Sequence, residues 1–283
     1  MTFLDQLTGP GTTLTVELRP PRMDQTQAAS IDAWFTMHEA VASLVAEGTP
    51  LFLTDGAVGA KEEENLHHLL TNLDPELQRD LVCPFLTTKH TLQYCQWYAA
   101  RVVEAGCGGP TVLGGDKHVG PPRCVEHGHE LRALIAERFP TLPLGGWANP
   151  HRDAARQVSF LTAADYHADF YLTQLVSHHD LPAVERFLAE LDRQGVAMPG
   201  VFGVFFYRSG RKKTLQRLAE FFPVPVDGVV ADFATGKTPE RVCAESIRAL
   251  EALGVRKFYV SNLQPELASA QLDGIRRELA ALD

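Results

Sequence analysis

The sequence predicts an α/β protein in which parallel strands close into a barrel surrounded by helices. Short apolar and β-branched runs, typical of buried strands, alternate with longer segments whose apolar residues recur at helical spacing. This alternation is typical of a parallel sheet covered by helices. It occurs eight times in 283 residues, close to the roughly 250 residues of a common (β/α)8, or TIM, barrel. We therefore expect residues 1–283 to form one barrel domain.

The expected elements follow one another in a regular order. The first strand, 14–18, ends before Pro20 and Pro21, because neither proline can donate a hydrogen bond to a sheet. Gly48 and Gly106 close the helices 31–46 and 92–105, as glycines commonly do. The other strands are expected at 51–54, 82–87, 111–113, 142–147, 170–176, 201–206 and 257–261, and the other helices at 61–72, 126–139, 153–166, 182–194, 213–222, 239–253 and 265–282.

An open, doubly wound sheet is the alternative to a closed barrel. A dinucleotide-binding sheet of that kind carries G-x-G-x-x-G after its first strand, and this chain has no such motif there. Gly106, Gly108 and Gly109 lie between a helix and a strand, where a cap and a loop explain them. The closed barrel is therefore favoured.

Composition excludes several classes of protein. The net charge of -9 argues against a nucleic-acid partner, and no apolar run approaches the roughly 20 residues of a membrane span. The first residues lack a basic flank and a signal-peptide core, so we expect a cytoplasmic protein. The five cysteines form no C-x-x-C pair, which predicts free thiols. Cys124, His127, His129 and the pair His178–His179 do not complete a metal-ligand set, so no metal is expected.

Polar residues stand at the carboxyl ends of the predicted strands. Barrel enzymes build their active sites at that face from the ends of several strands. Some polar residues are expected there in any case, because loops begin there, but three acids, an amide and a histidine are typical of a site. In chain order these residues are Glu17, Thr54, Asp55, Thr87, Thr88, Asp116, Asn149, His151, Gln174, Tyr207, Arg208, Ser261 and Asn262.

Glu17 is the most informative of these residues. It lies at the end of an otherwise apolar strand, where ionisation is costly and the pKa of a carboxyl should rise. A carboxyl with a raised pKa can act as a general acid at neutral pH. The alternative is that Glu17 simply pairs with Arg19 or Arg22.

Three segments together resemble the methylenetetrahydrofolate reductases. Residues 16–22, Val-Glu-Leu-Arg-Pro-Pro-Arg, look like that family's opening strand, and residues 113–116, Leu-Gly-Gly-Asp, are similar to its Arg-Gly-Asp turn. Residues 168–174, Ala-Asp-Phe-Tyr-Leu-Thr-Gln, resemble its sixth-strand signature. The order and spacing agree over about 14–263, and the three motifs fall at the ends of strands one, four and six.

The resemblance implies a barrel that reduces 5,10-methylenetetrahydrofolate to 5-methyltetrahydrofolate. By the same resemblance, Glu17 corresponds to the general acid, Asp116 to the acid that faces the pterin, and Gln174 to the amide that binds the folate. These residue types suit the reaction. A neutral carboxyl can protonate N10, a charged carboxylate can stabilise the resulting iminium cation, and an amide offers the pterin both a donor and an acceptor.

The sequence departs from the family where FAD usually binds. Gly114 replaces the arginine of the turn, residues 123–130 replace a Tyr-Ala-Ser-Asp stretch, and no lysine occurs within 152–165. A diphosphate needs cations or a helix N-terminus. We therefore expect FAD not to bind, and NADH or NADPH to give hydride directly to the folate. An FAD-dependent reductase with a remodelled site is the alternative.

Several further strand-end residues are candidates for ligand binding. Thr54 and Asp55 are expected to contact the substrate, and Phe206 and Tyr207 to stack on it, unless these aromatic rings belong to the core. The candidates for cofactor binding are Asn149, His151, Arg208 and Thr87. A loop hydrogen bond is the alternative for His151, and a solvated loop is the alternative for Arg208.

Other functions remain open from the sequence. One is a non-catalytic, folate-binding relative, which the presence of both Glu17 and Asp116 disfavours. Another is a different folate- or deazaflavin-dependent barrel enzyme that shares the one-carbon substrate. The sequence also leaves open whether NADH or NADPH is preferred and whether the chain forms a homo-oligomer.

Overall fold

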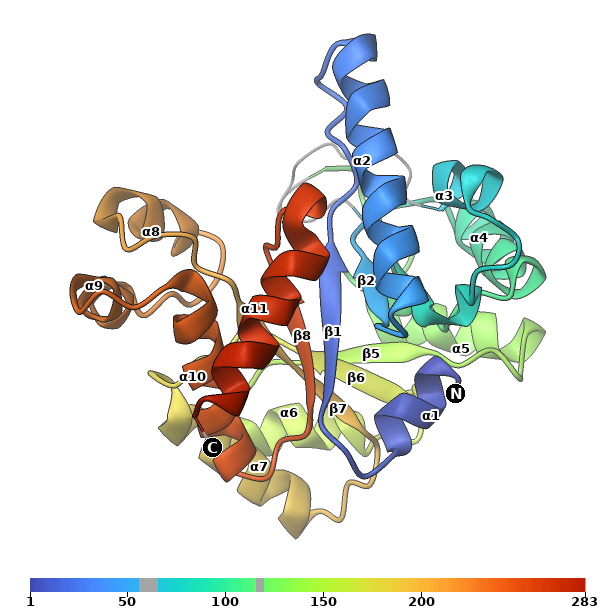
Figure 1. Ribbon diagram of the computed structural model, residues 1–283. Coiled ribbons are helices and arrows are strands. Elements are labelled where there is room, and N and C mark those ends of the chain that lie inside the picture. The colour runs from blue at the N-terminus through green and yellow to red at the C-terminus, as the bar shows by residue number, and fades with distance from the viewer. Residues whose placement is uncertain (56–65, 116–119, 283) are drawn as a thin grey trace.

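Eight parallel strands form a closed barrel in chain order, which confirms the predicted (β/α)8 fold (Figure 1). The computed structural model describes residues 1–55, 66–115 and 120–282. The barrel closes because β1 pairs with both β2 and β8. The strands are β1 (Thr13–Leu18), β2 (Leu51–Leu53), β3 (Val82–Thr87), β4 (Thr111–Leu113), β5 (Gly145–Ala148), β6 (Phe170–Thr173), β7 (Gly200–Phe205) and β8 (Lys257–Ser261).

Helices surround the barrel, as expected when each strand is followed by a helical segment (Figure 1). Within the described ranges, no helix is long and apolar enough to cross a membrane. The helices are α1 (Phe3–Thr8), α2 (Gln27–Ala46), α3 (His67–Asn72), α4 (Leu92–Ala105), α5 (Gly128–Arg138), α6 (Ala154–Leu161), α7 (Leu181–Arg193), α8 (Lys212–Leu218), α9 (Val226–Ala234), α10 (Pro239–Ala252) and α11 (Ala268–Ala280), with short 3-10 turns η2 (Arg79–Leu81) and η3 (Pro265–Leu267).

Two of these helices were not predicted, and one strand begins later than expected. Helix α1 has only Phe3 and Leu7 on its buried side, too few for a helical period, and α9 follows α8 before the last helix–strand unit. Strand β5 begins at Gly145 because Pro143 has no N–H and the Leu144 N–H donates to the Asp169 side chain at 2.8 Å. The predicted helix 61–72 lies partly outside the described residues.

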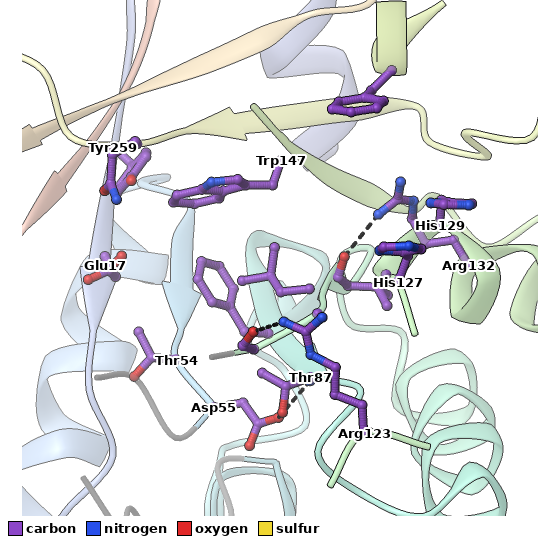
Figure 2. Close-up of a pocket in the computed structure, with 18 of the residues that line it drawn as sticks. Glu17, Thr54, Asp55, Thr87, Arg123, His127, His129, Arg132, Trp147 and Tyr259 are labelled. Atoms are coloured by element: carbon purple, nitrogen blue, oxygen red, sulfur yellow. Dashed lines mark hydrogen bonds between the residues drawn. The ribbon is translucent and has the colours of Figure 1, made fainter. Parts of the chain in front are cut away.

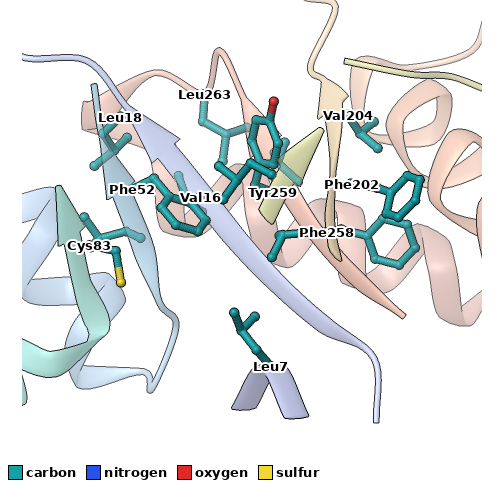
Figure 3. Close-up of a cluster of buried hydrophobic side chains, with 14 of the residues drawn as sticks. Leu7, Val16, Leu18, Phe52, Cys83, Phe202, Val204, Phe258, Tyr259 and Leu263 are labelled. Atoms are coloured by element: carbon teal, nitrogen blue, oxygen red, sulfur yellow. The ribbon is translucent and has the colours of Figure 1, made fainter. Parts of the chain in front are cut away.

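The amino-terminal helix closes one end of the barrel. The Phe3 ring packs edge-on against Phe52 and Phe170, with ring centroids 5.6 and 5.2 Å apart. Leu7, which is also buried, lies below the barrel strands in Figure 3. Buried Lys257 fixes this helix to β8, because its ammonium group donates to the carbonyl oxygens of Gln6 and Gly11.

Large aromatic rings fill the barrel interior beside glycines. A Cβ at Gly203 of β7 would lie 2.3 Å from the Tyr259 ring, so only glycine leaves room for that tyrosine. The Tyr259 hydroxyl donates to the Thr173 carbonyl oxygen at 2.7 Å. Figure 3 shows Tyr259 among the apolar side chains of β1, β2 and β7. Together, these contacts fix the Tyr259 ring inside the barrel, below its carboxyl-terminal end.

Candidate functional site

A cavity of about 850 Å³ lies at the carboxyl ends of the barrel strands (Figure 2). It is formed by residues from seven of the eight strands or the loops that follow them, by α5, by α6 and the segment after it, and by the segment after α8. The predicted site residues that line it together are Glu17, Thr54, Asp55, Thr87 and Gln174. Asp116, the second predicted acid, lies outside the described residues.

Glu17 is positioned by the pairing of β1 with β8. Its partner in the parallel register is Ser261, whose hydroxyl donates to Glu17 Oε1 at 2.6 Å. The Glu17 side chain lines the cavity, although the residue is only 9% exposed. Burial raises the pKa of this carboxyl, while the charge of Arg19 and the Ser261 hydrogen bond oppose the rise. The alternative partner Arg22 instead pairs with Asp24, with Nε 2.9 Å from Oδ1.

Asp55 and Thr87 are joined to each other across neighbouring strands. The carboxylate of Asp55 accepts hydrogen bonds from the Thr87 N–H at 2.7 Å and from the Thr87 hydroxyl at 2.9 Å. His90 Nε2 lies 2.9 Å from both Asp55 oxygens. Three donor groups therefore fix this carboxylate at the cavity wall. The sequence did not single out His90, because it lies beyond the strand end.

Gln174 places an amide on the same cavity. Its Oε1 accepts a hydrogen bond from the Leu175 N–H at 3.0 Å, and its own backbone N–H donates to the Ala148 carbonyl oxygen. Among the described residues, no hydrogen-bond partner occupies its side-chain NH₂ group. Gln174 can therefore donate to a ligand through that nitrogen.

Aromatic rings that the sequence did not identify contribute to the apolar part of the wall. Trp147 and Tyr259 line the cavity from β5 and β8, and Figure 2 places both rings near Glu17. The Tyr166 hydroxyl holds the Trp147 backbone, accepting from its N–H at 2.9 Å and donating to its carbonyl oxygen at 3.2 Å. The sequence did not point to these rings, because they lie within strands and not at the polar strand ends.

Basic side chains line the cavity away from Glu17, on α5 and the loop before it. His127, His129 and Arg132 lie together at the far end, and Arg123 lies between them and Asp55 (Figure 2). From the sequence, 123–130 was identified as a departure from the family pattern, and its Cys124, His127 and His129 as an incomplete metal-ligand set. Arg132 was missed because a single arginine in a predicted helix is usually a surface residue.

Two of the predicted aromatic residues lie in the core. Phe206 and Tyr207 are 1% and 6% exposed, and neither is among the described residues that line the cavity. Tyr207 packs against Phe205, with ring centroids 4.9 Å apart. Both rings therefore pack in the core, which was the alternative considered from the sequence. Their stacking on a substrate stays a prediction.

The other predicted cofactor-binding residues make local contacts outside the described cavity lining. Asn149 Oδ1 accepts from the His151 N–H at 3.0 Å, and His151 Nε2 lies 2.8 Å from the Leu175 carbonyl oxygen. The Arg208 guanidinium donates to the Asn262 carbonyl oxygen at 2.9 Å. The His151 contact with Leu175 is the loop hydrogen bond considered as the alternative from the sequence. Cofactor binding by Asn149, His151 and Arg208 stays a prediction.

Three side chains of metal-ligand type meet away from the cavity. His178, His179 and Asp232 place their ligand atoms within 4.8 Å of one another. Asp232 Oδ2 lies 3.1 Å from His178 Nε2 and 2.9 Å from His179 Nε2, while Lys237 Nζ donates to Oδ1 at 2.8 Å. Lys237 thus already provides this carboxylate with a cation. The cluster joins the β6–α7 loop to α9, and the expectation of no metal stays a prediction.

Comparisons with known proteins support the fold but give no family by sequence. No protein-family model and no curated protein matches the chain. An uncharacterized protein from Clostridium thermocellum, solved with two copies of 5-methyl-5,6,7,8-tetrahydrofolic acid, superposes with a TM-score of 0.69 at 12% identity over 99% of this chain and 100% of the other. A mandelate oxidase variant with an FMN adduct gives a TM-score of 0.50 at 12% identity, over 99% and 77%.

Proposed function

We propose that this protein reduces 5,10-methylenetetrahydrofolate to 5-methyltetrahydrofolate, with hydride coming directly from NADH or NADPH. The observation that carries this proposal is Glu17, a buried carboxyl with a raised pKa that shares one cavity with Gln174 and an aromatic wall. The resemblance of three sequence segments to the methylenetetrahydrofolate reductases supports the same substrate. The Clostridium thermocellum protein, a barrel of similar shape, binds the product of this reaction.

Glu17 supplies the proton that opens the five-membered ring of the substrate. The proton passes from its carboxyl to N10, the bond between N10 and the methylene carbon breaks, and the electron pair of that bond stays on N10. The product of this step is an iminium cation at N5. Because burial disfavours the charged form of Glu17, the carboxyl retains its proton at a higher pH than an exposed glutamate would.

Hydride transfer completes the reaction. Two electrons and one hydrogen move from C4 of the nicotinamide to the methylene carbon, which becomes the methyl group, and NAD⁺ or NADP⁺ is formed. The Glu17 carboxylate then takes a proton from solvent. The cavity of about 850 Å³ is near the upper end of the roughly 300–1,000 Å³ found for ligand sites, which favours a pterin and a nicotinamide bound together.

Side chains near Glu17 orient the substrate. The side-chain NH₂ group of Gln174 suits an acceptor on the pterin edge, and Trp147 offers a face for stacking. Asp55, held by Thr87, places a carboxylate on the same wall. We assign stabilisation of the iminium cation to Asp116, on the basis of the resemblance.

Direct transfer from NAD(P)H is proposed on the sequence departures at the usual flavin site. Gly114 replaces the arginine of the family turn, and helix α6 carries no lysine. The test is the purified protein itself. We expect no flavin absorbance and a substrate-dependent oxidation of NADH or NADPH without added FAD. A yellow protein that needs FAD would support the flavin-dependent alternative.

A non-catalytic folate-binding protein is the second candidate, and the Clostridium thermocellum complex is the observation that favours it. Such a protein would bind 5-methyltetrahydrofolate without oxidising a nicotinamide. Calorimetric binding of 5-methyltetrahydrofolate, combined with the absence of turnover with NADH, NADPH, FAD and a deazaflavin, would identify this function. Turnover with the deazaflavin alone would identify the third function considered from the sequence.

A further inference from the structure

Two arginines, Arg123 and Arg132, line the cavity away from Glu17, and no carboxylate of the described residues forms an ion pair with either of them. Figure 2 shows Asp55 near Arg123, and His127 and His129 near Arg132. Asp165 also lines the cavity, with a side chain that is 71% exposed and lies 3.6 Å from His129 Nε2. An exposed pair of this kind neutralises little charge deeper in the cavity.

Arg132 is the more deeply buried of the two arginines. It is only 3% exposed, and its described hydrogen bonds go to neutral carbonyl oxygens: Nε donates to Tyr166 at 2.9 Å and Nη1 to Val112 at 3.0 Å. Its guanidinium carbon lies 4.4 Å from the centroid of the Tyr166 ring. No carboxylate of the described residues pairs with it, and Nη2 has no described partner. Burial of an uncompensated cation is costly, so an arriving anion would be bound strongly.

The start of helix α5 brings Arg132 against the end of β4. Gly128 begins this 11-residue helix and lines the cavity together with His127 and His129. A Cβ on Gly128 would lie 3.0 Å from the Val112 carbonyl oxygen, so glycine allows the helix to start close against the end of β4. The helix end itself is capped, because the His127 side chain accepts from the Glu130 N–H and the Glu130 carboxylate accepts from the His127 N–H at 2.9 Å. An anion here is therefore bound by the arginines and not by the helix end.

Arg123 brings a second guanidinium to the turn after β4. Its Nη1 donates to the Glu126 carbonyl oxygen at 2.8 Å and its Nη2 to the Gly115 carbonyl oxygen, while its buried Nε has no partner within the described part of the chain. A Cβ on Gly114 would lie 3.2 Å from the guanidinium carbon. Glycine at position 114 therefore gives the Arg123 side chain room to reach the cavity wall.

We infer that these groups form an oxyanion subsite, which binds the negatively charged part of a ligand whose ring lies near Glu17. Its chemistry fits the diphosphate of a nicotinamide dinucleotide or the glutamate carboxylates of a folate, because guanidinium groups bind both. The naming of these two sources rests on the proposed function. The subsite itself rests on Arg132 and Arg123.

The test compares ligands with and without their anionic part, using Arg132→Met, Arg132→Lys and the control Arg138→Met. Arg138 lies on the same helix but is exposed and outside the described cavity lining. Calorimetry would measure the binding of inorganic pyrophosphate, of NADH against reduced nicotinamide riboside, and of 5-methyltetrahydrofolate against tetrahydropterin, which lacks the glutamate. Circular dichroism and thermal melting would establish that each variant folds.

We expect Arg132→Met to weaken the charged member of at least one pair by about 10- to 100-fold, the range for a hydrogen bond to a charged group. The uncharged member and the Arg138→Met control should be unchanged, and Arg132→Lys should restore part of the loss. Sensitivity of the NADH pair would identify the diphosphate, and sensitivity of the folate pair the carboxylates.

Equal affinities of wild type and a folded Arg132→Met variant for every probe would refute the subsite. If Arg132→Met does not fold, Arg123→Met replaces it in the same comparison, and equal affinities of wild type and Arg123→Met for every probe would refute the subsite. Pyrophosphate binding that depends on Arg132 in a protein without reductase activity would keep the subsite and refute the proposed function. The two failures are thus distinguishable.

Discussion

Replacement of Glu17 by glutamine removes the proposed proton donor and leaves its surroundings in place. The new amide keeps an oxygen that can accept the Ser261 hydrogen bond, which is 2.6 Å long in the wild type, and glutamine has almost the same volume as glutamate. General acid catalysis contributes about 10²- to 10⁴-fold to a rate. We therefore expect Glu17→Gln to lower kcat by that factor, or about 3–5 kcal/mol at 1.36 kcal/mol per tenfold, while the Kd of 5-methyltetrahydrofolate changes little.

The pH dependence gives a second readout of the same substitution. The protonated carboxyl is the active form, so kcat/KM of the wild type should fall as pH rises through the raised pKa of Glu17. The free energy of unfolding should change with pH in the same direction. Between the usual value of 4.5 and the raised pKa, the folded state binds more protons than the unfolded state, so the free energy of unfolding falls as pH rises. Glu17→Gln should remove both effects and leave the protein at least as stable at neutral pH.

The assay is the steady-state oxidation of NADH or NADPH with 5,10-methylenetetrahydrofolate, together with calorimetric binding and thermal melts across the pH range. The exposed variant Glu137→Gln on α5 makes the same chemical change outside the described cavity lining and should behave as wild type. A Glu17→Gln variant with wild-type turnover, or with the same fall in kcat/KM at high pH, would refute the assignment of Glu17 as the acid.

Three further substitutions test the site and its support. Ser261→Ala removes a hydrogen bond that favours the charged form of Glu17, so the fall in kcat/KM should move to higher pH; an unchanged or lower midpoint would contradict this. Gly203→Ala places a Cβ 2.3 Å from a buried tyrosine ring and should lower the free energy of unfolding by about 1–3 kcal/mol, measured by urea titration; an unchanged midpoint would show that the ring can move. Lys257→Met leaves two carbonyl oxygens without their donor and should cost about 1–3 kcal/mol in the same titration, whereas no loss would mean that water replaces the ammonium group.

The barrel was predictable because its signal is repeated along the whole chain. Each strand is a short apolar run and most helices have a clear period, so errors at single elements did not change the fold. The carboxyl ends of all strands meet at one face, so Glu17, Asp55 and Gln174 could be assigned to a common cavity before their positions were known.

Other parts of the site could not be predicted from the same signal. Trp147 and Tyr259 lie within strands, and only three-dimensional packing decides whether such rings fill the core or face a cavity. Arg132 looks like a surface residue until the helix is placed against β4. Phe206 and Tyr207 follow the end of β7, yet they pack into the core, because position relative to a strand end does not fix the direction of a side chain.

Direct hydride transfer from the nicotinamide to the folate is tested most directly with NADH or NADPH that carries deuterium at C4 of the nicotinamide ring. The protein would be incubated with this donor and 5,10-methylenetetrahydrofolate in ordinary water, and the product analysed by mass spectrometry. We predict one deuterium in the methyl group of 5-methyltetrahydrofolate formed by a flavin-free protein. Product without the label, as expected when hydride first passes to an exchangeable flavin N5 position, or no product at all, would contradict the proposed reaction.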